Sequence, residues 1–171
     1  MSPAAFALAL VDPRGRCDRK GLLALAVVML VLQVAVEASL WLADVDLAST
    51  APTAVKLAFC WAAVAAVTKR LHDLGRSAWW MLAAFVVVVV WSFAVAFAAV
   101  MAAGPEALTP RSVWFAALFA VSSLPALAAL LWLHLAKGMP GPNRFGPAPD
   151  RSGFSGPAPQ STVRLAEAVA A

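Results

Sequence analysis

Four long runs of apolar residues constrain this chain more than any other feature of its sequence. They cover residues 22–44, 53–70, 78–103 and 112–136. A helix rises about 1.5 Å per residue, so about 20 apolar residues cross the roughly 30 Å of hydrocarbon in a bilayer. Hydrophobic residues make up 63% of the 171 and charged residues 13%, which is more apolar surface than a soluble core can bury. The sequence therefore predicts an all-α, polytopic membrane protein with four transmembrane helices.

Two of the runs have features of their own. The run 53–70 is the shortest and carries Lys56 near its start, so a shallow or re-entrant segment is the alternative to a full crossing there. The run 112–136 contains Pro125, which removes one backbone hydrogen bond and clashes with the carbonyl four residues earlier. We expect a kink at this proline, with the adjacent serines helping to satisfy the freed groups.

The domain organisation follows from the positions of the runs. We expect a basic cytoplasmic segment at 1–21, a four-helix transmembrane domain at 22–137 and a cytoplasmic tail at 138–171. Six prolines lie in residues 140–159, including Pro140 and Pro159 themselves, among Gly, Ser and Gln residues. This composition predicts a flexible C-terminal tail without regular structure.

The basic residues predict the orientation of the chain. Lys and Arg in short flanks of membrane helices are retained in the cytoplasm. Lys56 and Arg111 lie on one side of the predicted arrangement, and eleven residues lie on the other: Arg14, Arg16, Arg19, Lys20, Lys69, Arg70, Arg76, Lys137, Arg144, Arg151 and Arg164. Both termini are therefore expected to be cytoplasmic. Because the net charge of +4 is spread over these flanks instead of one patch, we expect no binding of nucleic acid.

The connection between the second and third runs has the residues of a tight helical hairpin. Gly75 is placed to adopt the left-handed conformation that ends a helix, and Ser77 is placed to cap the next helix. The two helices are predicted to be antiparallel neighbours. Trp79 and Trp80 are then expected at the cytoplasmic interface of the bilayer.

Asp73 is expected to need a cationic partner, because a carboxylate in the last turn of a helix faces the negative end of the helix dipole. Arg70 and Arg76 are each three residues away, and Arg144 in the tail is a third candidate. We expect Asp73 to pair with Arg144 or Arg76. Phe145 is expected to pack near the two tryptophans of the hairpin.

Two segments carry a resemblance to a known family, and a third segment matches more weakly. The two segments are Arg70-Leu71-His72-Asp73 with Arg76-Ser77-Ala78-Trp79-Trp80, and Gly141 with Asn143-Arg144-Phe145-Gly146-Pro147. The weaker match is Gly15-Arg16 with Arg19. In these residues the chain resembles the domain of unknown function 805 family, the small YhaH-like proteins of the bacterial inner membrane.

The resemblance covers roughly residues 13–149 and implies a multi-pass protein of the bacterial inner membrane. The family pattern often continues with an acidic residue after the last motif, where this chain has Ala148. The family has no established activity, so the resemblance supplies no catalytic residues.

Alternative chemical sites are weaker interpretations of the same residues. Ser77, His72 and Asp73 suggest a hydrolase, but adjacent residues of a helix point in different directions. His72 and His134 both lie toward the cytoplasmic side, but no further ligand pattern accompanies them. We therefore expect no catalytic residues, metal or cofactor, and no enzymatic activity.

Three polar residues lie inside or near the apolar runs. Gln33 and Glu37 are four residues apart and share one face of a helix. Glu37 lies about 10 Å below the outer end of the first run and Lys56 about 5 Å below that of the second, and the long side chain of Lys56 can reach a neighbouring helix. We expect an interhelical ion pair between Glu37 and Lys56. Proton or ion transport is the alternative role for these groups.

The preferred function is a non-enzymatic membrane module whose cytoplasmic face binds anionic lipid headgroups or a protein partner. Its positive field would come from Arg14, Arg16, Arg19, Lys20, Lys69, Arg70 and Arg76. Orientation of the chain alone would also explain these charges. The alternative function is a subunit of a small-solute transporter or channel, working as a homo-oligomer because four helices leave little room for a pathway.

Overall fold

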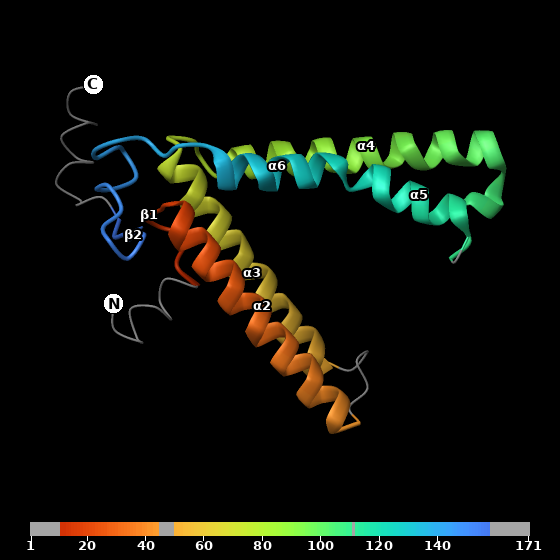
Figure 1. Cartoon of the computed structure of the whole chain (residues 1–171), viewed down its shortest axis with the longest axis horizontal. Helices are drawn as coiled ribbons and strands as arrows, with labels where there is room; N and C mark the ends of the chain where they lie inside the picture. Colours follow the sequence, from red (N-terminus) through yellow and green to blue (C-terminus); the bar gives the residue numbers. More distant parts are fainter. Residues whose placement is uncertain (1–10, 45–49, 111, 158–171) are drawn as a thin grey trace. The chain divides into compact units, whose positions relative to one another are not determined.

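The computed structural model describes residues 11–44, 50–110 and 112–157 (Figure 1). Arg111 and Arg164, which entered the prediction of orientation, lie outside these residues. The elements are β1 (Arg16–Cys17), α2 (Arg19–Leu42), α3 (Thr50–Asp73), α4 (Trp79–Ala103), η1 (Pro105–Leu108), α5 (Val113–Ser122), α6 (Leu124–Leu135) and β2 (Phe154–Ser155). They form two compact units. The first unit comprises Met1–Ser77 with Ala136–Ala171, and the second comprises Ala78–Leu135.

Within the described residues, three helical stretches are long and apolar enough to cross a membrane: Arg19–Leu42, Trp79–Ala103 and Val113–Leu135. They support the prediction of a largely helical membrane protein. Helix α3 contains the predicted run 53–70 and has 24 residues, the same number as α2, but it is not among the three. Its lower hydropathy has a simple cause, since Lys56, Lys69 and Arg70 all lie within it.

In the first unit, α2 and α3 lie side by side, with the start of α2 and the end of α3 next to β1 (Figure 1). Asp18 caps α2 by accepting a 2.7 Å hydrogen bond from the backbone N–H of Gly21. Leu25 and Ala65 are almost fully buried, and the small alanine lets the helices approach closely. The apolar core of this unit therefore lies near the end of α3.

In the second unit, the predicted kink at Pro125 is confirmed, because α5 ends at Ser122 and α6 begins at Leu124. A proline has no N–H, so the carbonyl of Val121, four residues earlier, loses its helical donor. The indole of Trp91 on α4 donates a 2.9 Å hydrogen bond to that carbonyl. A side chain of a neighbouring helix thus satisfies the group that the proline frees.

Gly75 terminates α3 as predicted. It follows the last turn of the helix in the left-handed conformation, with φ +71°. The N–H of Gly75 bonds to the carbonyl of His72, and the N–H of Arg76 bonds to that of Leu71, the two bonds of a Schellman motif. The predicted cap by Ser77 is wrong: α4 begins at Trp79, so Ala78 occupies the N-cap position, with no side-chain cap. Helices α3 and α4 belong to different units, so their antiparallel packing stays a prediction.

The described part of the tail, residues 138–157, differs from the flexible segment that was predicted. Strand β2 pairs antiparallel with β1, with Arg16 opposite Ser155 and Cys17 opposite Phe154. Before it, Asn143 and Gly146 exchange two backbone hydrogen bonds in a tight turn. The Gly, Pro and Asn residues that disfavour helices here specify turns, and a segment before α2 supplies the strand partner.

Candidate functional site

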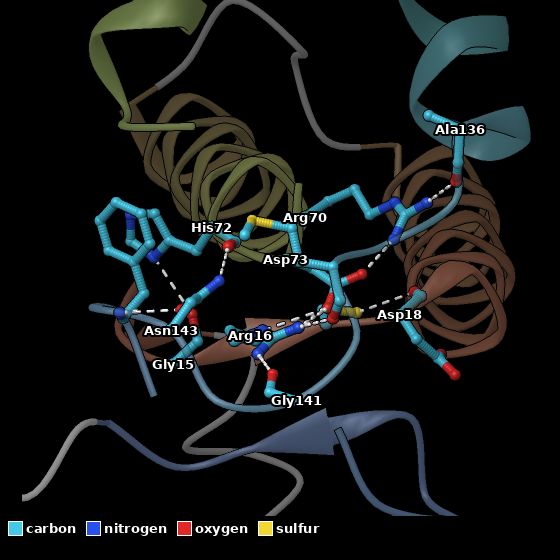
Figure 2. A network of polar contacts seen from close by, with 12 residues as sticks. Gly15, Arg16, Asp18, Arg70, His72, Asp73, Ala136, Gly141 and Asn143 are labelled. Carbon is cyan, nitrogen blue, oxygen red and sulfur yellow. Dashed lines mark hydrogen bonds and ion pairs between the residues drawn. The ribbon is translucent and has the colours of Figure 1, made fainter. Parts of the chain in front are cut away.

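A cluster of three buried charged side chains, Arg16, Arg70 and Asp73, joins distant parts of the chain (Figure 2). Arg16 donates to Oδ1 of Asp73 from Nε at 3.2 Å and from Nη2 at 2.9 Å. Arg70 donates to Oδ2 from Nη1 at 2.5 Å. The exposed fractions of the residues are 0%, 0% and 2%. We call these three residues the buried cluster.

The two guanidinium groups also hold the backbone that follows α6. Arg16 donates from Nη1 to the carbonyl of Gly141 at 2.5 Å and from Nη2 to that of Met139 at 2.6 Å. Arg70 donates from Nη2 to the carbonyl of Ala136 at 2.5 Å. These carbonyl dipoles compensate the second positive charge, which the single carboxylate leaves unbalanced. Only a planar guanidinium supplies so many donors in fixed directions, so lysine cannot replace either arginine here.

The sequence permits this close approach through glycine. A Cβ atom on Gly138 would lie 1.9 Å from Oδ2 of Asp73. A Cβ atom on Gly75 would lie 2.3 Å from Sδ of Met139. The backbone N–H of Met139 also bonds to the carbonyl of Asp73 at 2.9 Å. The chain after α6 therefore lies directly against the last turn of α3.

A second contact group surrounds His72. Its ring stacks on Phe145 with centroids 3.9 Å apart and planes 6° apart. Nδ1 lies 3.1 Å from the carbonyl of Gly15, so this nitrogen carries the proton that is donated. Asn143 donates from Nδ2 to the carbonyl of His72 at 2.9 Å, and the guanidinium of Arg144 lies over the Phe145 ring at 4.6 Å. Burial, and to a lesser degree the charge of Arg144, lower the pKa of His72 despite the bond to Gly15.

The buried cluster and the His72 group hold residues 11–21, 69–77 and 136–157 together, and we call these residues the cap. Most basic side chains of the cap point outward: Arg14, Arg19, Lys20, Arg76, Lys137, Arg144 and Arg151 are exposed. Three that were expected to contribute to the positive surface are buried instead: Arg16, Lys69 and Arg70. The cap therefore has a basic exterior around a charged interior.

The partners of Asp73 were predicted only in part. Arg70 was one of three candidate partners, and it does pair with Asp73. Arg144 as the partner is wrong, because its guanidinium lies over Phe145. A pair with Arg76 stays a prediction. Arg16 was missed as a partner, although the Gly15-Arg16 motif had marked it.

The remaining expectations concern the packing of Phe145 and the alternative catalytic and metal sites. The predicted packing of Phe145 near Trp79 and Trp80 would join the two units and stays a prediction. The carboxylate of Asp73 faces two guanidinium groups and Nδ1 of His72 faces a carbonyl, so His72 and Asp73 do not have the geometry of a catalytic triad. Within the described residues, no three His, Cys, Asp or Glu side chains gather as a metal site would require.

Glu37 and Lys56 lie far from the cap along α2 and α3. Both line one groove of about 400 Å³ between these helices. Among the described residues, the ion pairs within 4.0 Å involve Asp73 and not Glu37 or Lys56. Glu37 accepts a 3.1 Å hydrogen bond from Gln33 instead. The structure thus brings the two residues of the predicted pair to one groove without an ion pair between them.

Comparison with known proteins gives one result. No curated protein and no solved structure matches the chain. The matching family model covers residues 10–147, which include the whole buried cluster and the His72 group. Its description is a protein of unknown function, DUF805, and the chain belongs to this family, as its motifs predicted.

Proposed function

We propose that this protein crosses the bacterial inner membrane four times and that its cytoplasmic cap binds anionic lipid headgroups. The observation that carries the proposal is the cap itself. Three segments far apart in the sequence are folded together by buried charges, while the other basic side chains are exposed. Such an arrangement presents cations on a shaped surface next to the membrane, where each is worth about 1 kcal/mol near anionic lipid.

Contacts within the first unit support four crossings. Strand β1 precedes α2 and strand β2 follows α6, and the two strands are hydrogen-bonded to each other. Both segments must then lie on one side of the membrane, which requires an even number of crossings. If the three candidate stretches all cross, α3 must cross as well. Its 24 residues and its position alongside α2 support this assignment.

The cytoplasmic position of the cap rests on its basic residues. Lys and Arg next to membrane helices are retained in the cytoplasm, where anionic lipid also attracts them. Orientation and lipid binding therefore use the same charges. A test of lipid binding must use purified protein, for which orientation no longer matters.

The test is the binding of defined lipids to the full-length protein in detergent, measured by native mass spectrometry. Phosphatidylglycerol and phosphatidylcholine with the same acyl chains are compared. We expect a preference for phosphatidylglycerol. It should weaken by up to about 100-fold in a variant with Arg14, Arg19 and Lys20 replaced by Gln, because three charges are lost at about 1 kcal/mol each.

The matched control keeps the charges: Arg14→Lys with Arg19→Lys should retain most of the preference. High salt should reduce it in the wild type, because surface charges are screened. If the Gln variant prefers phosphatidylglycerol as strongly as the wild type, the cap is not an anionic-lipid site and its charges serve orientation alone.

A further inference from the structure

The groove between α2 and α3 has a polar end and an apolar remainder. Gln33, Glu37 and Lys56 line one part of it, while Met29, Phe59 and Ala63 are among the apolar residues that line the rest. All of them belong to the first unit, so the groove does not depend on the second. An apolar groove in a membrane helix pair suits an acyl chain, and the charged end requires a different kind of group.

The two charges lie at the same depth. Glu37 is five residues before the end of α2 at Leu42, and Lys56 is six residues after the start of α3 at Thr50. At about 1.5 Å per residue, each lies roughly 7 to 9 Å below the end of its helix. This depth lies just inside the hydrocarbon, a few ångströms below the boundary between headgroups and acyl chains, in the leaflet opposite the cap.

The two charges are open to an external partner. Both side chains are exposed, and within the described residues neither takes part in an ion pair. Gln33 donates to one carboxylate oxygen of Glu37, which fixes the carboxylate and leaves acceptor capacity free. A cation and an anion that line one groove without an ion pair between them are complementary to a ligand that carries both charges.

We propose that this groove binds one phospholipid with a zwitterionic headgroup that contains a primary amine, that is, phosphatidylethanolamine. Its ammonium donates hydrogen bonds to Glu37, its phosphate accepts from Lys56, and one acyl chain lies along the apolar part of the groove.

The chemistry of the groove discriminates among headgroups. Phosphatidylcholine has the same phosphate, but its trimethylammonium has no N–H to donate to Glu37. Phosphatidylglycerol has no cation, so it leaves the carboxylate unpaired next to another anion. A charge-assisted hydrogen bond made by one headgroup and not by the other predicts about a tenfold preference for phosphatidylethanolamine over phosphatidylcholine.

The two cysteines of the chain provide a direct measurement. Cys60 lines the groove and is exposed, so a bound acyl chain should shield it from N-ethylmaleimide. Cys17 lies in the cap, is fully buried, and has its pKa raised to about 12, chiefly by burial. Because thiolate is the reactive form, Cys17 stays unlabelled as long as the protein is folded. It therefore reports the integrity of every variant in the same experiment.

The experiment follows labelling of Cys60 in the purified full chain in mixed micelles. Phosphatidylethanolamine or phosphatidylcholine is added, and the two lipids have the same acyl chains. We expect phosphatidylethanolamine to slow labelling at about one tenth of the mole fraction that phosphatidylcholine requires. Glu37→Gln should abolish this difference. Lys56→Gln should weaken protection by both lipids, since both carry the phosphate. Glu106→Gln, an exposed carboxylate in η1 outside the groove, should behave as the wild type.

Three results would overturn the proposal: equal protection by the two lipids, no protection by either, or a preference that survives Glu37→Gln while Cys17 stays unlabelled. The inference requires α2 and α3 to lie in the bilayer, and it does not require the cap to bind anionic lipid. The headgroup preferences of the two sites differ, so one site can fail while the other stands.

Discussion

The carboxylate of Asp73 is shared by two guanidinium groups that have no exposed surface. Burying charges is costly, and a buried ion pair adds little stability compared with apolar packing. Removing one partner is different, because the remaining charges stay buried without compensation. Asp73 therefore affects the folding of the cap more than the free energy of unfolding of the whole protein.

Replacement of Asp73 by Asn should open the cap, since breaking a buried pair costs about 3 to 5 kcal/mol. Trypsin cleavage at the exposed Lys137, Arg144 and Arg151 should become at least about tenfold faster, because even about 1.4 kcal/mol changes an opening equilibrium by that factor. Cleavage is followed by mass spectrometry in detergent. Glu106→Gln is the control, and cleavage of the Asp73 variant at the wild-type rate would contradict the role given to this carboxylate.

His72 should make the stability of the cap depend on pH. In the unfolded chain its ring takes up a proton as the pH falls through 6.5, whereas burial lowers the pKa of the folded ring. The unfolded state then binds more protons in that window, so stability rises with pH and is lost as the pH falls below about 6.5. Trypsin cleavage of the tail should accelerate between pH 7.5 and 5.5, after correction for the activity of the enzyme on an unfolded peptide.

The control for this effect is His72→Phe, which keeps an aromatic ring against Phe145 and cannot titrate. Its opening should depend less on pH than that of the wild type, whatever its absolute rate. The same pH dependence in both proteins would assign the effect to other groups.

The side chains of the cap were predictable only where local rules applied. The dipole of α3 showed that Asp73 needs a cation, and Arg70 lies within one turn of it. Arg16 is 57 residues away, and no local rule links a residue before α2 to the last turn of α3. The Gly15-Arg16 motif was the sequence feature that pointed to Arg16. The folded chain brings Arg16 next to Asp73, a contact that sequence spacing alone does not indicate.

Among the elements, chain ends and turns were predicted with unequal success. Gly75 ends α3 because a positive φ favours glycine, and this rule needs only the sequence. Ser77 fails as a cap because a shift of one residue in the start of α4 moves it out of position. Strand β2 was missed because its partner, β1, lies at the other end of the chain. Composition predicts the absence of a helix well, but it cannot show long-range pairing.

Trp91 on α4 should stabilise the kink between α5 and α6. Trp91→Phe removes the donor to the carbonyl of Val121, and we expect a loss of about 0.5 to 2 kcal/mol, the range for hydrogen bonds between membrane helices. The loss should be smaller when Pro125→Ala restores a backbone N–H to the same carbonyl. The free energy of unfolding is measured with and without Pro125→Ala, by reversible unfolding with dodecyl sulfate in mixed micelles.

The double-mutant cycle separates the hydrogen bond from the loss of indole volume, which is common to both backgrounds. Trp132→Phe, at an exposed position on α6, is the control and should show no coupling to Pro125. Additive effects of Trp91→Phe and Pro125→Ala would mean that the indole contributes by packing alone.

For the whole molecule, the apolar runs predicted the membrane class, and the structure adds a constraint on the number of crossings. Composition left α3 uncertain, because its charged residues lower its hydropathy. The β1–β2 pair and the bonds from Arg16 to Met139 and Gly141 support an even number of crossings, since they join the segments that precede α2 and follow α6. An odd number of crossings would break all of these contacts.

Single cysteines in a background with Cys17→Ala and Cys60→Ala should therefore separate into two sets. With four crossings, Asp44→Cys after α2 and Glu106→Cys after α4 should react with a membrane-impermeant maleimide in intact cells. Arg14→Cys and Arg151→Cys should react only after permeabilisation. If α3 does not cross while the other three stretches do, Arg14→Cys and Arg151→Cys fall on opposite sides. That result would be incompatible with pairing of β1 and β2, so the accessibility of these two positions tests the crossing number and the folded cap together.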